Sequence, residues 1–198
     1  EATKNGDLHN EICLFYNNEY SELIREKWYT PLNSSIHMSP QIIYNHHNDQ
    51  IVLFQDDENN LIAFNKDGDR IWKKHIEKNI LGEINSIDFY NNQKHQAIFN
   101  TEDKLYLIDR NGDFVDGYPK SLPTYTRIGH ALFDYDNNKE YRILIVGNDN
   151  NIYNLNKNGD QLEGWKYIKT TNQINKTPIH FVVNGRDYIL NATNNSTT

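Results

Sequence analysis

The sequence predicts an all-β fold of repeated four-stranded antiparallel units, and three observations lead to this prediction. A hydrophobic strand, an Asx-Gly turn and a short strand with one large aromatic residue follow one another repeatedly. The turn glycines Gly68, Gly112 and Gly159 recur at about 46 residues, the period of a propeller blade. Pro40 and Pro178 lie about three such periods apart, each at the expected start of a strand. The predicted fold class is a β-propeller of about four repeat units.

Each repeat divides into four strands, named A to D in chain order, because runs rich in β-branched and aromatic residues alternate with turn residues. The A strands are expected at 39–45, 84–90, 128–134 and 177–183, and the B strands at 50–55, 96–100, 141–146 and 187–191. The C strands are expected at 12–16, 61–65, 105–109 and 152–156, and the D strands at 23–30, 70–76, 114–120 and 162–168. The chain thus opens on strands C and D and closes on strands A and B.

The connections between strands A and B are alike in all four repeats. They are rich in Asn, Asp and Gly at 45–49, 91–95, 136–140 and 184–186. Asn and Gly tolerate the positive φ angles that tight hairpins require. We interpret these residues as turn formers.

One large aromatic residue occupies an equivalent place in every D strand: Trp28, Trp72, Tyr118 and Trp165. A ring of sugar-stacking platforms is one interpretation. A regular aromatic residue per repeat more often fills the gap between adjacent blades. We therefore expect these four side chains to be wedges between blades.

The domain organisation predicted is a polar segment at 1–10, propeller repeats over 11–193 and a polar tail at 194–198. The repeats are divided at 11–56, 59–102, 103–148 and 150–193. Either the ends pair to close a four-bladed ring, or the chain is an arc of a larger propeller, which is the expectation here. An arc leaves an unpaired edge on the C strand at 12–16 or the B strand at 187–191. Because the chain starts at Glu1, we expect it to belong to a longer protein.

Composition excludes several classes of protein. The formal net charge of -7, with scattered Lys and Arg residues, argues against nucleic-acid binding, which needs a basic face. No apolar run approaches the ~18 residues needed to span a bilayer. Cys13 is the only cysteine, so neither an internal disulfide nor a CxxC zinc site is possible. We expect Cys13 to be a small buried hydrophobe on a strand.

One segment resembles the start of a calcium-binding loop. Asp134, Asp136 and Asn138 follow the Asp-x-Asp-x-Asn spacing, but position 142, where a closing carboxylate would help, is Arg. Calcium is therefore a weak candidate here, and no metal or other cofactor is predicted. The histidines are dispersed, and no HExxH, GxSxG or phosphate-binding Gly-rich motif occurs. No catalytic residue is predicted.

Acidic residues mark the connections between strands B and C. These residues are Asp56, Asp57, Glu58, Glu102, Asp103 and Asp149. On one face of a propeller they would form an acidic rim, which could dock a basic or polar partner. Solvated turns between strands are the interpretation favoured by their position.

Segment 63–72 resembles the repeat of the quinoprotein (PQQ-type) propellers, in which an Ala-x-Asx strand precedes a Gly turn and a Trp. Segments 104–112, 117–119 and 133–142 resemble more closely a family of uncharacterised bacterial envelope-associated propeller proteins. The resemblance covers residues 22–193. It implies a propeller at the C-terminal end of a large chain, in the cell envelope or outside the cell, and it supplies no catalytic residues.

The sequence therefore favours a non-catalytic protein-interaction or scaffold module of a larger envelope or cell-surface protein or complex, with a protein or the remainder of a longer chain as partner. The alternative is a quinoprotein-like enzyme or ligand-binding propeller with a polar site at its axis. Three or more converging titratable side chains at the axis would favour that alternative.

Overall fold

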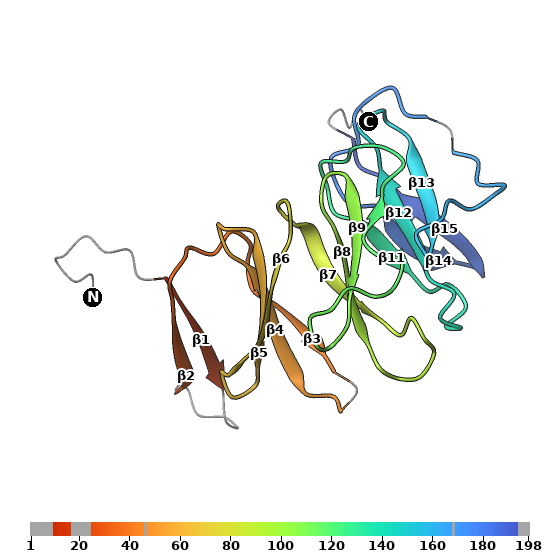
Figure 1. Ribbon diagram of the computed structural model, residues 1–198. Helices are drawn as coiled ribbons and strands as arrows, with labels where there is room; N and C mark the ends of the chain where they lie inside the picture. The colour runs from red at the N-terminus through yellow and green to blue at the C-terminus, as the bar shows by residue number, and fades with distance from the viewer. Residues whose placement is uncertain (1–9, 17–24, 46, 168, 194–198) are drawn as a thin grey trace.

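A computed structural model describes residues 10–16, 25–45, 47–167 and 169–193, and these contain fifteen β-strands and no helix. The predicted polar segments 1–10 and 194–198 lie outside the described residues, apart from Asn10. The strands follow one another as a row of antiparallel sheets along the chain (Figure 1). The all-β prediction is confirmed for the described residues.

Two sheets are complete four-stranded blades. Blade 1 consists of β3 (Gln41–Tyr44), β4 (Gln50–Gln55), β5 (Asn60–Asn65) and β6 (Arg70–His75), hydrogen-bonded in that order. Blade 2 consists of β7 (Leu81–Ile87), β8 (Gln96–Asn100), β9 (Lys104–Ile108) and β10 (Lys120–Ser121). Every neighbouring pair in both blades is antiparallel.

Three smaller sheets complete the arrangement. Blade 3 has β11 (Ala131–Phe133), β12 (Arg142–Val146) and β13 (Ile152–Asn156). The first half-blade pairs β1 (Asn10–Tyr16) with β2 (Arg25–Leu32), which are strands of types C and D. The last half-blade pairs β14 (Ile179–Val183) with β15 (Arg186–Leu190), which are strands of types A and B.

The predicted bounds hold best for the inner strands and fail for two of the D strands. β4, β8 and β13 have the expected bounds. The expected D strand 114–120 is reduced to one bridge at Phe114 and the short β10, and 162–168 forms no strand within its described part. Gly117 and Gly164, at φ +82 and +76, turn the chain where the strand was expected to continue.

The core lies between consecutive blades. In the three blades, most residues of the B and C strands are buried, and β8 is buried at every residue from Gln96 to Asn100. Ala63 of β5 and Phe99 of β8 belong to one apolar cluster, which joins blade 1 to blade 2. Similar clusters join blade 2 to blade 3 and blade 3 to the last half-blade. Each blade is therefore stabilised mainly by its neighbours.

The A–B hairpins confirm the interpretation of their Asn residues as turn formers. Asn48, Asn91, Asn137 and Asn184 have φ between +50 and +63. The strand entrances are also as expected, because Pro40 directly precedes β3 and Pro178 directly precedes β14.

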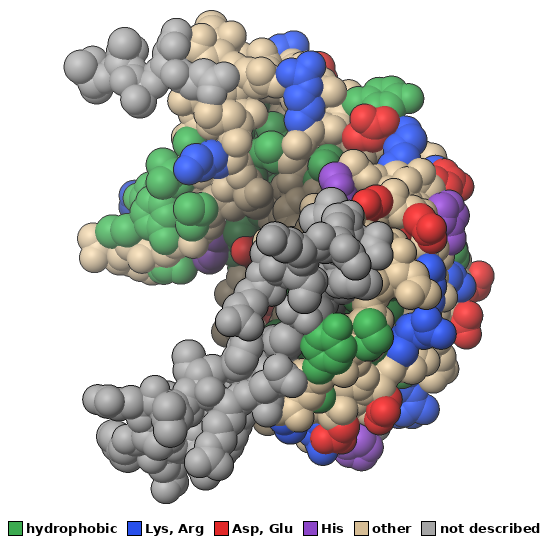
Figure 2. All heavy atoms as spheres, turned by 90° about the vertical axis from the view of Figure 1, so that its left-hand side faces the viewer, with side chains coloured by type: hydrophobic (Ala, Val, Ile, Leu, Met, Phe, Trp, Pro, Cys, Tyr) green, Lys and Arg blue, Asp and Glu red, His purple; other side chains and the backbone are tan. Residues whose placement is uncertain are grey.

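The described residues curve into an open arc (Figure 2). Among them, β1 is hydrogen-bonded only to β2, and β15 only to β14. A closed ring is therefore not formed between these strands. No described helix is long and apolar enough to cross a membrane.

Candidate interaction surfaces

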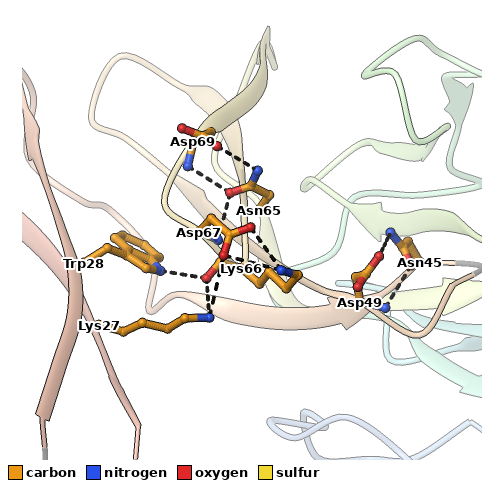
Figure 3. A network of polar contacts seen from close by, with 8 residues as sticks. All are labelled: Lys27, Trp28, Asn45, Asp49, Asn65, Lys66, Asp67 and Asp69. Atoms are coloured by element: carbon orange, nitrogen blue, oxygen red, sulfur yellow. Dashed lines mark hydrogen bonds and ion pairs between the residues drawn. The ribbon is translucent and has the colours of Figure 1, made fainter.

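At each of the first three joints between blades, an aromatic side chain of one blade contacts a turn of the next blade. Trp28 on β2 donates from Nε1 to the carbonyl oxygen of Lys66 at 3.1 Å, and Lys27 Nζ donates to the same oxygen at 2.8 Å (Figure 3). The ring covers Gly68 so closely that a Cβ there would lie 2.7 Å from Trp28 Cδ2. Only glycine leaves room for the tryptophan ring at this position, which explains the glycine of the Asx-Gly turn.

The hydrogen bond from an aromatic side chain to the turn of the next blade recurs at the next two joints. Trp72 Nε1 donates to the carbonyl oxygen of Arg110 at 3.1 Å, and Tyr118 Oη donates to that of Lys157 at 2.5 Å. The wedge interpretation is confirmed at these positions. Trp165 behaves differently, because its Nε1 donates to the carbonyl oxygen of Ile152 in its own blade at 2.7 Å.

Side-chain amides join the blades a second time. Gln55 donates to the carbonyl oxygen of Lys78 at 2.9 Å and accepts from Ile80 N at 2.7 Å. Asn100 makes the corresponding bonds, with Ile128 O at 3.4 Å and with His130 N at 2.7 Å. In each case the amide at the end of a B strand holds the chain that leads into the next A strand.

Ile128 and His130, the residues that Asn100 binds, line a hollow where the A strands β7, β11 and β14 begin. The hollow measures about 660 Å³. Its lining includes the titratable residues Glu83, Arg127, His130 and Lys176. Gly82 and Gly129 also line it and approach closely, since a Cβ on either would lie 2.7 Å from the Cα of the other.

His130 is the buried polar residue of this hollow. Only 3% of it is exposed, and this burial lowers the pKa of its imidazole to about 4. Its Nδ1 lies 3.2 Å from Asn100 Oδ1, an acceptor, so Nδ1 carries the proton. The other nitrogen, Nε2, is buried and has no hydrogen-bond partner among the described residues.

The hollow has four titratable side chains, which satisfies the number of three or more expected of a polar site at the axis, but these side chains do not converge. No ion pair joins Glu83 to Arg127 or Lys176 in the part of the chain that the structure describes. Nor do the described residues contain a group of three His, Cys, Asp or Glu side chains that could hold a metal ion. The arrangement offers separate polar groups around a hollow, without a nucleophile and a base in contact.

Asp56 of the predicted acidic rim is a buried turn residue. Its Oδ1 accepts from the backbone N–H groups of Glu58 at 3.0 Å and Asn60 at 2.8 Å, and Ser34 donates to Oδ2 at 3.0 Å. Burial raises the pKa of this carboxyl, but the hydrogen bonds from Asn60 and Ser34 outweigh burial, so that its pKa is lowered. Asp57 and Glu58 lie beside it and are exposed.

The rim carboxylates of blade 2 are paired with a lysine from the preceding connection. Lys78 Nζ lies 2.8 Å from both Glu102 Oε1 and Asp103 Oδ2. Asp149 of blade 3 accepts from Tyr153 Oη at 2.8 Å and from Asn151 Nδ2 at 2.6 Å. The structure therefore does not bring the six carboxylates together as a free acidic patch, and their role in binding stays a prediction.

The weak calcium candidate is also a turn. Asp134 Oδ1 accepts from Asn138 N at 3.0 Å, and both carboxylate oxygens of Asp134 accept from Lys139 N. Asn138 Oδ1 accepts from Glu140 N at 2.9 Å. Asp134 and Asn138 thus close the hairpin between β11 and β12, and no hydrogen bond or ion pair joins the Asp136 side chain to them among the described residues. Nothing in the structure tests calcium binding here, and these residues stay a weak candidate.

The last half-blade presents an apolar face that the sequence analysis did not single out. Along β14 and β15 the register places five apolar side chains on one face: Ile179, Phe181, Val183, Tyr188 and Leu190. Their exposed fractions run from 42% to 60%. The opposite face carries His180 and Ile189, which pack against blade 3. The alternation in 179–183 signalled a strand, but only its place at the open end of the arc leaves this face uncovered.

A scan against protein-family models and a search of curated proteins find no match. Solved structures do match. The crystal structure of BamB from Moraxella catarrhalis is 17% identical, with a TM-score of 0.55 over 84% of this chain and 47% of that chain. The structure of BBS1N in complex with ARL6DN is 11% identical, with a TM-score of 0.58 over 81% of this chain and 51% of that chain.

These likenesses support the β-propeller fold. At such identities they show the fold alone. The chain spans about half the length of each solved structure, in agreement with an arc that ends in two half-blades.

Proposed function

We propose that the chain is a non-catalytic protein-interaction module, a propeller scaffold within a larger envelope or cell-surface assembly. The observation that carries the proposal is the exposed apolar face of β14 and β15. The corresponding B strands β4 and β8 are buried, whereas Tyr188 and Leu190 of β15 are 44% and 56% exposed. A face of this composition gains most when another protein surface covers it.

Three further observations support the proposal. BBS1N, a propeller of similar fold, was solved in complex with a protein, ARL6DN. The placement in the envelope rests on the resemblance of segments 104–112 and 133–142 to envelope-associated propellers. The rim residues Asp57, Glu58 and Glu102, which are exposed, offer a second contact region for a basic or polar partner.

Capture from the native source tests the proposal. Tagged wild-type protein is compared with Tyr188→Asp, which places a charge on the apolar face, and with Tyr90→Asp, a control in which the tyrosine is 54% exposed elsewhere. We expect protein bound in near-stoichiometric amount by the wild type and by Tyr90→Asp, and its loss with Tyr188→Asp. Equal recovery with all three baits, or none with the wild type, would contradict the proposal.

The alternative is a ligand site in the hollow at the A strands. The observation that favours it is His130 Nε2, a buried acceptor without a partner, in a hollow also lined by Arg127 and Lys176. These groups fit a small anion that carries a hydroxyl, such as glycolate. Calorimetric titration with glycolate tests this site: binding by the wild type and its loss in His130→Leu would support it, and absence of heat at millimolar glycolate would exclude this ligand class.

A further inference from the structure

Three asparagine–glycine pairs among the described residues are chemically alike but lie in different surroundings. They are Asn111-Gly112, Asn158-Gly159 and Asn184-Gly185. In such a pair the backbone nitrogen of the glycine can attack the side-chain carbonyl carbon of the asparagine, because glycine has no Cβ to obstruct the approach. The new N–Cγ bond closes a succinimide ring, and the Cγ–Nδ2 bond breaks with release of ammonia. Water then opens the ring at either carbonyl carbon, which gives aspartate or isoaspartate.

The glycine nitrogen is held in the first two pairs. Gly112 N donates to the carbonyl oxygen of Asp109 at 3.1 Å. Gly159 N donates to the carbonyl oxygen of Asn156 at 2.9 Å. The first turn is also packed against the ring of Trp72, since a Cβ on Gly112 would lie 2.7 Å from its Cγ. In both pairs a hydrogen bond must therefore break before the nitrogen can attack.

Nothing holds the third pair in this way. Asn184 and Gly185 form the turn between β14 and β15, with φ of +50 and +72. Among the described residues, Gly185 N donates no hydrogen bond and the Asn184 side chain makes none. A Cβ placed on Gly185 would have no atom within 4 Å. The peptide between these two residues can therefore rotate towards the side chain without breaking a hydrogen bond or displacing a neighbour.

The exposure of this turn is a property of the hairpins between strands A and B. Asn184 and Gly185 are both exposed. Asn48 and Asn91, in the corresponding hairpins of blades 1 and 2, are exposed as well. Both of these blades pack against a neighbour on each side. The access of water to the turn therefore does not depend on what packs against the sides of β14 and β15.

We infer that Asn184 is a site of selective spontaneous deamidation, at which asparagine is converted to aspartate or isoaspartate while Asn111 and Asn158 persist. The inference goes beyond the proposed function and does not depend on it. The net reaction consumes one water and releases one ammonia, and the product carries a new negative charge.

The isoaspartate product would also change the backbone of the hairpin. It inserts the Asn184 methylene group into the main chain of a tight turn whose ends pair Val183 with Arg186. Because the backbone of a short hairpin turn matches the twist and spacing of its strands, the longer turn should loosen β14 and β15.

Ageing of the purified full chain tests the inference. The protein is incubated in mildly alkaline water enriched in heavy oxygen, so that products formed during incubation carry the label and those formed during digestion do not. Mass spectrometry of the peptides then measures the loss of each asparagine, and an isoaspartyl methyltransferase identifies isoaspartate. We expect Asn184 to react at least about tenfold faster than Asn111 or Asn158, a ratio that corresponds to about 1.4 kcal/mol, the order of one hydrogen bond.

Two controls separate the fold from the local sequence. In guanidinium chloride the three asparagines, each followed by glycine, should react at similar rates, because the hydrogen bonds and the packing are lost. In the folded protein, Gly185→Ala should slow the reaction of Asn184 by about tenfold, because the added Cβ obstructs the attack. The same variant should leave the rate at Asn158 unchanged, since that residue lies in another blade.

The other outcomes would overturn the inference. Equal rates at the three asparagines in the folded protein would show that the turn of Asn184 is protected as well as the others. A ratio that persists in guanidinium chloride would show that the neighbouring residues in the sequence set the rates. An unreacted Asn184 in the folded protein, over a time in which it is lost in guanidinium chloride, would show that the hairpin itself prevents ring closure. None of these rates depends on whether the native-source capture finds a partner.

Discussion

At the scale of single residues, the buried polar side chains hold the backbone at the joints between blades. Asn100 uses both ends of its amide on the chain around His130, and Asp56 collects the free N–H groups of the turn after β4. A buried N–H without an acceptor costs about 1–3 kcal/mol. Each of these side chains therefore stabilises the fold by binding backbone groups that would otherwise lack a partner. The sequence pointed to Asp56 as a rim charge. Its burial depends on Ser34 and Asn60 folding over it, which no local pattern encodes.

His130 should make the protein sensitive to mild acid. Its folded-state pKa of about 4 is below the ordinary histidine pKa of 6.5, so the unfolded chain takes up a proton over that interval and the folded chain does not. Stability is then fully present above pH 6.5 and falls by up to about 3 kcal/mol as the pH drops to 4. Urea unfolding of His130→Gln should lack this slope. His95→Gln, in which the histidine is exposed, should retain it.

Asp56 should act at lower pH. Its pKa is lowered in the folded state, so its contribution to stability is present above the ordinary pKa of 3.8 and is lost as the pH falls through the folded-state pKa. Asp56→Asn should therefore destabilise the protein by about 2 kcal/mol at pH 7, and by much less at pH 2. Asp57→Asn, in the same turn but exposed, should change the urea midpoint little at either pH. A constant difference between wild type and Asp56→Asn across this range would contradict the assignment.

At the scale of elements, the period and the turn glycines were sufficient to predict the B and C strands of the three blades, because these strands are mostly buried and read as apolar runs. The D strands of blades 2 and 3 were predicted too long. The predicted strands 114–120 and 162–168 run through Gly117 and Gly164, whereas these glycines turn the chain away from the sheet. β6 has no such glycine and keeps the full strand. The hollow and the exposed face depend on how the blades pack against one another, so the residue pattern of single strands does not predict where they lie.

Replacing a turn glycine by alanine should show, as a loss of stability to urea, how closely the aromatic residue packs on that turn. In Gly112→Ala the new Cβ would lie 2.7 Å from Trp72 Cγ, at φ +85. In Gly185→Ala the φ of +72 is similar, but nothing lies within 4 Å. The free energy of unfolding of Gly185→Ala should fall only by the backbone strain of about 1–3 kcal/mol, and that of Gly112→Ala should fall by about 2 kcal/mol more. Equal urea midpoints for the two variants would show that the joint absorbs the methyl group freely.

At the scale of the whole molecule, stability should be graded along the arc. Blades 1 and 2 are covered on both sides, whereas β15 has one free edge and one exposed face. Local opening is easiest where few apolar contacts must be broken. The arrangement is therefore closer to a row of nearest-neighbour contacts than to one central core.

Hydrogen exchange of dilute protein should report this gradient. Amides of β8 and β9 should exchange roughly 100-fold or more slowly than those of β15. Mass spectrometry of peptic peptides resolves these segments. Equal protection of β15 and β8 in dilute solution would contradict the gradient and indicate that the end is already covered within one chain.

The direction of these aromatic contacts along the chain also limits the symmetry that an assembly of several copies can have. Each aromatic residue at the first three joints reaches forward along the chain, so the two ends of the arc are different surfaces and a back-to-back dimer would not use them both. Contacts between unlike ends propagate from copy to copy until the rotation closes or a fibre grows. An assembly that closes would have a fixed mass, whereas one that does not close would form filaments whose length grows with concentration.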